Sequence, residues 1–193
     1  MADPPTSTTE PTDPGPPEPN GPARSSLKTL LVYGLCIGGL FAIRFLPPVD
    51  THVVQPYTAL VAIGAELIVK AFGTEIVRDD LVIRSPDFSL VIQEECNGIS
   101  ALLIFLAAVL AHPVAPLKKL FGIALGIPAI YVFNEIRVVS LYYIKWHWPA
   151  AFDVMHEYVW QALVIIFAIV AWLFWAGLCD RSRQGKHGEA AAR

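Results

Sequence analysis

Charged residues are scarce in this sequence. Only 16% of its 193 residues are Asp, Glu, Lys or Arg, whereas 54% are hydrophobic. Soluble domains carry about 25% charged residues, so this composition argues against a water-soluble fold. The basic residues are also too scattered to form a groove for nucleic acid, which needs them clustered. We therefore expect one membrane domain that has the lipid bilayer, and not nucleic acid, as a partner.

Cysteine is rare as well, with three residues in the chain. Cys36, Cys96 and Cys179 lie at different depths in three different apolar runs. A disulfide requires Cα atoms within about 7 Å of each other, which such depths do not allow. We therefore expect three thiols and no disulfide. We also expect neither a metal ion nor a cofactor.

Four apolar runs are long enough to cross a membrane, which takes about 20 helical residues. They are residues 27–46, 97–117, 120–144 and 158–178. The predicted fold is therefore mainly α, a polytopic membrane helix bundle with four spans.

The two ends of the chain differ from this bundle. Residues 1–26 are rich in proline and lack apolar periodicity, which predicts a disordered cytoplasmic tail. Residues 180–193 predict a basic cytoplasmic C-terminal tail. The membrane-embedded domain is therefore expected over residues 27–179.

Residues 56–72 form a further apolar segment, but Glu66 and Lys70 interrupt it and make it amphipathic. Three basic clusters flank the four runs, and the positive-inside rule assigns all three to the cytoplasm. An even number of crossings then separates Lys28 from Lys118, and two of the four runs already supply it. The segment is therefore predicted to be an interfacial or re-entrant helix, with a fifth span as the alternative.

Short segments of β type occupy residues 76–92. They flank Arg84-Ser85-Pro86-Asp87, whose proline and aspartate favour a turn, so we expect a short hairpin. Acidic side chains outnumber basic ones there, which agrees with an extracytoplasmic location. One hypothesis is that an extended peptide pairs with the free edge of this hairpin by strand addition.

The predicted topology brings Cys96 to the same extracytoplasmic level as Arg137 and His156. Cys96 directly precedes an apolar helix, which either Cys96 or Asn97 could cap. The positive end of the helix dipole favours a nucleophilic thiolate, whereas the two preceding glutamates oppose it, so a cationic neighbour is needed. The alternative interpretation is that Cys96 is a small buried hydrophobe.

Arg137 is an anomaly because it lies within an apolar run. An arginine at the centre of a membrane helix costs about 2.5–3.5 kcal/mol on insertion scales, which makes it a candidate site residue. Its guanidinium could hold a thiolate or an oxyanion but cannot act as a base near neutral pH. The alternative is a structural arginine that snorkels to the headgroups or pairs with Glu135.

A base must therefore come from another residue. His156 precedes the last span with Glu157 beside it as a possible orienting group, and imidazole titrates near working pH. His147 lies between two tryptophans of the kind that settle at the interface, so an anchoring role is expected for it.

Three motifs, taken in chain order, resemble the exosortase and archaeosortase family of membrane transpeptidases. They are Cys96-Asn97-Gly98, Asn134-Glu135-Ile136-Arg137 and His156. The resemblance covers residues 27–178. The short length, the Leu46-Pro47-Pro48 turn and the Pro56-Tyr57-Thr58 segment are most similar to the compact exosortase H type.

The resemblance implies a function and roles for these residues. Cys96 would attack a peptide bond to form a thioester, Arg137 would stabilise the oxyanion or thiolate, and His156 would act as acid and base. The implied supporting residues are Asn97, Gly98, Asn134, Glu135 and Glu157.

The resemblance also implies partners and a location. The substrates would be exported proteins with a C-terminal sorting signal, made of a short motif of the IPTLxxWG type, a membrane helix and a basic tail. The acceptor would be a lipid or glycan amine. The enzyme would lie in the bacterial cytoplasmic (inner) membrane with its active site on the extracytoplasmic side. The chain has fewer spans than the longest family members.

Two other functions remain open from the sequence. The first is a non-enzymatic transporter or assembly module in which Arg137 and Glu135 line a polar pathway. Such a module should tolerate Cys96→Ala, whereas an enzyme should lose its activity. The second is a hydrolytic intramembrane protease, which differs from a transpeptidase only in its acceptor.

Overall fold

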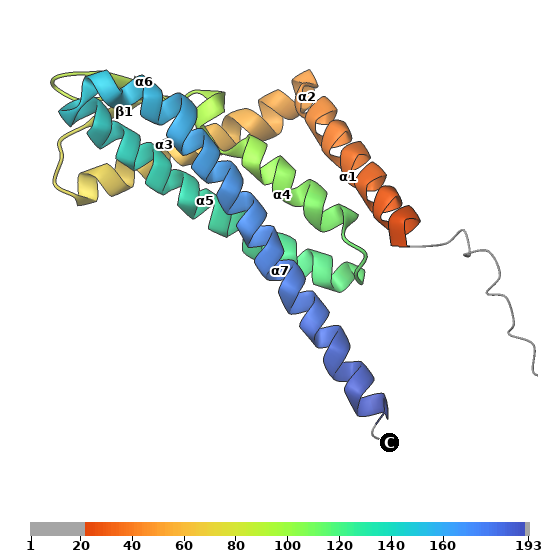
Figure 1. Ribbon diagram of the computed structural model, residues 1–193. Coiled ribbons are helices and arrows are strands. Elements are labelled where there is room, and N and C mark those ends of the chain that lie inside the picture. The colour runs from red at the N-terminus through yellow and green to blue at the C-terminus, as the bar shows by residue number, and fades with distance from the viewer. Residues whose placement is uncertain (1–21, 192–193) are drawn as a thin grey trace, which may run out of the picture.

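The computed structural model describes residues 22–191, which form a mainly helical bundle and one small sheet (Figure 1). The helices are α1 (Pro22–Arg44), α2 (Pro47–Val49), α3 (Gln55–Ala71), α4 (Ile99–Ala111), α5 (Pro116–His147), α6 (Phe152–Val154) and α7 (Trp160–Ala191). The strands are β1 (Val77–Asp79), β2 (Val82–Arg84) and β3 (Ser89–Val91). Residues 1–21 of the predicted tail lie outside the described residues, and residues 22–26 belong to α1.

Helix length and composition support a membrane protein. Within the described residues, three helical stretches are long and apolar enough to cross a bilayer: Pro47–Ala71, Pro116–His147 and Pro149–Arg181. Leu30–Arg44 and Ile99–Ala111 are shorter apolar helices. The predicted count of four spans is therefore not confirmed, because the predicted runs of residues 27–46 and 97–117 correspond to these shorter helices. Two segments, α4 and α3, show why the structure differs from the prediction.

The first difference is that α4 is shorter than the predicted run of residues 97–117. It ends at Ala111, and its 13 residues span about 20 Å. Two prolines cause this end. His112 precedes Pro113 with a ψ of 131°, and Ala115 precedes Pro116 with a ψ of 146°, because a residue before proline avoids the α region.

The second difference concerns α3, which the sequence predicted as an interfacial or re-entrant helix. It continues from a π-helical turn, Asp50–Val54, so the whole stretch is long enough to span. Its aromatic contacts with α5 join Tyr57 to Tyr131 and Phe72 to Tyr143. The length and composition of this stretch agree with the alternative, a further span, and do not bear out a helix that only lies in the interface.

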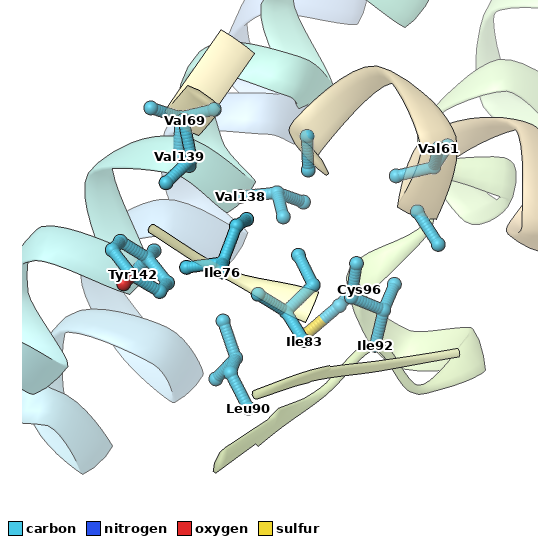
Figure 2. Close-up of a cluster of buried hydrophobic side chains, with 12 residues drawn as sticks. Val61, Val69, Ile76, Ile83, Leu90, Ile92, Cys96, Val138, Val139 and Tyr142 are labelled. Carbon is cyan, nitrogen blue, oxygen red and sulfur yellow. The ribbon is translucent and has the colours of Figure 1, made fainter. Parts of the chain in front are cut away.

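The predicted hairpin is part of a three-stranded antiparallel sheet with the order β1-β2-β3. The turn between β2 and β3 was predicted. The turn between β1 and β2 was not, and there Asp80 has a φ of +54°, a conformation that aspartate tolerates better than most residues. Ile83 and Leu90 point from the sheet toward α5 and pack in a buried cluster with Val138 and Tyr142 (Figure 2).

The ends of the helices gather at opposite sides of the bundle. At the side where α7 ends, the Lys118 Nζ donates to the carbonyl of Cys179 (3.1 Å), and the carbonyl of Lys118 accepts from the Trp175 Nε1 (3.2 Å). The sheet, α6 and the start of α4 lie at the other side (Figure 1). The basic segments next to α5 and α7 therefore share one side, which agrees with the topology predicted from their charges.

Candidate active site

Cys96 lies at the end of a 3-10 turn, Glu94–Cys96, three residues before Ile99, the first residue of α4. Its side chain is 8% exposed and belongs to the cluster that the sheet forms with α3 and α5 (Figure 2). The three cysteines form no disulfide, as expected. Cys96 is therefore buried close to the start of a helix, and its chemistry depends on the polar groups around it.

Asn97 ties this start of α4 to α3. Its Oδ1 accepts the backbone N–H of Ile99 (2.9 Å), but the N-cap residue of α4 is Gly98 and neither Cys96 nor Asn97, the two that the sequence had offered. Its Nδ2 donates to the Thr58 Oγ1 (2.8 Å), and that hydroxyl donates to the carbonyl of Val54 (2.8 Å). Asn97 and Thr58 are both almost fully buried, so this network fixes the position of the segment that carries Cys96.

Gly98 and Asn134 hold the same segment from the side of α5. Gly98 has a φ of +77°, and a Cβ atom there would lie 2.8 Å from the Asn134 Oδ1. The close approach lets the Asn134 Nδ2 donate to the carbonyl of Cys96 (3.1 Å). A residue with a side chain at position 98 would therefore disturb both the backbone and this hydrogen bond.

His156 meets Cys96 directly. Its Nε2 lies 2.5 Å from the Cys96 Sγ, so the two side chains are in direct contact. His156 lies in a π-helical turn, Met155–Val159, between α6 and α7. Such turns insert an extra residue into a helix and often occur at functional sites. Within this turn the His156 side chain points to the Cys96 sulfur, whereas the side chain of the next residue, Glu157, is exposed.

Phe152 and Lys145 support this imidazole. The Phe152 ring lies nearly parallel to the His156 ring, with centroids 5.6 Å apart. The Lys145 Nζ lies 4.5 Å from the centroid of the same phenyl ring. The stack restricts rotation of His156. Sequence reasoning missed both residues, although Phe152 is one helical turn before His156 and Lys145 is two turns after Arg137.

Arg137 is 1% exposed and is therefore not a snorkelling residue. It lies on the same face of α5 as Asn134, whose side chain meets the carbonyl of Cys96. Its Nε makes no hydrogen bond, and within the described residues Arg137 forms no ion pair with a carboxylate. A buried cation on this face of α5 is the kind of neighbour that a thiolate requires, and the role of Arg137 toward Cys96 stays a prediction.

Glu135 and Glu157, two of the predicted supporting residues, lie elsewhere. Glu135 is 4% exposed and lines a groove between α3 and α5, where its carboxylate approaches the Tyr131 hydroxyl and the backbone of Gly64. Glu135 and Arg137 are two residues apart and therefore project from different faces of α5, and Arg137 is not among the residues that line this groove. Glu157 makes no hydrogen bond or ion pair within the described part of the chain, and its orienting role stays a prediction.

The other histidines are separate from this cluster. His147 stacks on Trp146, with centroids 4.9 Å apart, and on Tyr143 at the end of α5, and its anchoring role stays a prediction. His112 contacts Trp172 and Trp175 at the opposite side of the bundle. Among the described residues, no group of three or more His, Cys, Asp and Glu side chains could hold a metal ion.

A pocket of about 200 Å³ opens onto the Cys96–His156 pair. One wall is formed by β3 and the two residues that follow it, and the other by α5 and α6. The residues that line it are Ser89, Leu90, Val91, Ile92, Gln93, Cys96, Val138, Leu141, Lys145, Phe152 and His156. It is the space in which a substrate could reach the sulfur.

The fold and the site define a class of protein: a helical membrane protein with a cysteine–histidine pair beside a buried arginine. A comparison with protein families then identifies the family. The model of the transmembrane exosortases matches residues 23–176, so the chain belongs to the transmembrane exosortase family. Comparisons with curated proteins and with solved structures found no match.

Proposed function

We propose that this exosortase is a cysteine transpeptidase that cleaves the C-terminal sorting signal of exported proteins. The observation that carries the proposal is the 2.5 Å contact between the Cys96 Sγ and the His156 Nε2 beside the buried Arg137. A thiol next to an imidazole and a permanent cation has the surroundings of an activated nucleophile.

The first half of the reaction forms a thioester. His156 takes the proton of Cys96, and the sulfur attacks the scissile carbonyl carbon. Arg137 stabilises the negative charge that develops on the carbonyl oxygen. The C–N bond then breaks, and His156 returns the proton to the departing amine, which leaves with the membrane helix and basic tail of the signal.

The second half transfers the exported protein. An amine of an envelope lipid or glycan attacks the thioester, His156 accepts its proton, and an amide forms as the sulfur departs. The proton returns to the Cys96–His156 pair, which restores the starting state. If water attacked instead, the enzyme would be a hydrolytic protease, and the mass of the new C-terminus of the product distinguishes the two.

The finer assignments rest on the motifs in the sequence. The compact chain and its Leu46-Pro47-Pro48 turn support the exosortase H type and a signal of the IPTLxxWG type. Basic residues at one side of the bundle support four spans, with the site on the extracytoplasmic side of the bacterial inner membrane.

The test is to trap the thioester. Purified full-length enzyme is incubated with a sorting-signal substrate in the absence of an acceptor amine and quenched in acid, and intact-mass spectrometry should detect an acyl group on Cys96. Cys96→Ala is the control and should carry no adduct. An adduct on another residue, or processing that persists in Cys96→Ala cells, would contradict the proposal and favour a transport or assembly role.

A further inference from the structure

β3 is an edge strand whose outer side is open. It pairs with β2 on one side, and no described strand pairs with it on the other. Alternate residues of an antiparallel strand direct their N–H and C=O groups to opposite neighbours. Ile92 donates to the carbonyl of Leu81, and Ser85 donates to the carbonyl of Phe88, so Phe88, Leu90 and Ile92 face β2.

Ser89 and Val91 therefore present their backbone groups at the open edge. Both side chains are exposed, whereas Leu90 between them is buried. The edge is also the wall of the pocket that ends at Cys96 and His156. The backbone N–H and C=O groups at this edge therefore lie along the same pocket as Cys96 and His156.

The direction of β3 follows from its contacts with α5. Phe88 lies against Tyr142, with ring centroids 5.1 Å apart, whereas the carbonyl of Cys96 meets Asn134, two turns further into the bundle. β3 thus runs from the end of α5 toward the middle of the bundle. An exported protein with a C-terminal membrane helix enters the site in the same direction, from its exported domain toward the lipid.

We propose that the segment of the sorting signal just before the scissile bond adds to the sheet as a parallel fourth strand along β3, with hydrogen bonds to Ser89 and Val91. This inference rests on the proposed function. Main-chain hydrogen bonds then deliver the scissile carbonyl to Cys96, and the pocket between β3 and α5 selects side chains on one face of the substrate strand.

The first test measures binding to the Cys96→Ala protein, so that it does not depend on catalysis. The probe is a fluorescein-labelled peptide that contains the segment IPTLAAWG, and fluorescence anisotropy reports its affinity. Backbone N-methylation is introduced at one residue after another. Methyl groups at every second residue should weaken binding about tenfold through the loss of a hydrogen bond, and those between should change it less than about twofold.

The second test alters the edge. Val91→Pro removes an N–H that does not take part in the β2–β3 ladder and should weaken binding about tenfold. Glu75→Pro is the control, because it adds a proline just before β1, on the other side of the sheet. Size-exclusion profiles report whether each variant is folded. If Val91→Pro is not, the N-methyl series on the unaltered edge still decides.

The outcomes separate this inference from the proposed function. Uniform or absent effects of N-methylation, together with normal cleavage by the wild-type enzyme, would overturn strand addition and leave the transpeptidase intact. An alternating pattern without cleavage would support strand addition and contradict the transpeptidase. A change of oligomeric state in Val91→Pro with unchanged peptide binding would mean that a second copy occupies the edge, and would also overturn the inference.

Discussion

Cys96 and Cys179 are buried to a similar degree at opposite sides of the bundle, 8% and 5% exposed, yet their surroundings differ. Asn97, Asn134 and Arg137 are buried around the position of Cys96. Cys179 belongs to an apolar cluster of α4, α5 and α7. Burial of polar groups costs free energy unless they are paired, so the side with Cys96 carries a cost that the other side avoids.

The side with Cys179 shows how the bundle is held together. A Cβ atom at Gly122 would lie 2.5 Å from the Trp175 Nε1, and one at Gly126 would collide with the Phe105 ring. These glycines let α5 approach α7 and α4 closely, the usual way in which membrane helices pack. The side with Cys179 thus holds the closely packed helix contacts, and the side with Cys96 holds the candidate active site.

The largest difference in cleavage rate is expected between substitutions of the two cysteines. Cys96→Ala should reduce cleavage of a sorting-signal substrate by roughly 10⁴-fold or more, because no thioester can form. Cys179→Ala should change it less than about twofold. Immunoblots of the substrate and of the membrane-inserted enzyme in cells measure both. A similar loss in both variants would remove the distinction between the two sides.

The second largest difference in cleavage rate is expected between substitutions of His156 and His147. His156→Ala should lower the cleavage rate about 10²- to 10⁴-fold, the usual contribution of a general acid and base. His147→Ala should keep most of the activity, because His147 only stacks on aromatic side chains. Initial rates with purified protein give the comparison. Loss of activity in the second variant alone would reassign the base.

Gly98 and Gly73 provide a matched pair for the backbone at the site. Both have positive φ, 77° and 83°, but a Cβ atom meets Asn134 only at Gly98, and nothing within 4 Å at Gly73. Gly73→Ala should cost about 1–2 kcal/mol of strain. Gly98→Ala should lower the free energy of unfolding by about 1–3 kcal/mol more, because the added Cβ atom overpacks against Asn134. It should also lower the cleavage rate, because the segment with Cys96 shifts. Thermal unfolding and initial rates are measured on the same samples, and equal effects at both positions would contradict the role of Asn134.

On the packing side, Gly126→Ala should lower the free energy of unfolding by about 1–3 kcal/mol through its collision with Phe105. Gly38→Ala is the control, because nothing lies within 4 Å of a Cβ atom there, and alanine should raise helix stability by up to about 1 kcal/mol. Denaturant titration in detergent gives both values. For the folded fraction of Gly126→Ala we expect an unchanged cleavage rate, and a slower rate would link the two sides of the molecule.

The smallest effect is expected at the rim of the site. The Arg44 Nη2 pairs with the Glu94 Oε2 at 3.0 Å, but the Glu94 side chain is 48% exposed. Glu94→Gln should therefore lower stability by less than about 1 kcal/mol. Asp79→Asn, which breaks the exposed pair with Arg84, is the reference, and thermal unfolding compares them. A much larger loss at Glu94 would mean that α1 helps to hold the Cys96 segment.

Part of the candidate site could be predicted because some of its residues are unusual at their positions in apolar membrane segments. Arg137 within an apolar run and Cys96 at the start of another are visible without coordinates. The end of α4 was predicted wrongly, because residues 97–117 stay apolar in composition although Pro113 and Pro116 break the helix. Phe152 and Lys145 carried no such signal, because an aromatic or basic residue near a helix end is ordinary in a membrane protein.

The sequence by itself determined that this is a helical membrane protein and that Cys96, Arg137 and His156 follow one another in three successive apolar elements. Insertion into lipid depends on local composition, which a sequence records directly. Only the tertiary structure decided that His156 touches the sulfur, that Glu135 faces another groove and that β3 leads to Cys96. Those contacts depend on how each helix is rotated about its axis, and the π-helical turn at His156 and the packing of neighbouring helices decide that rotation.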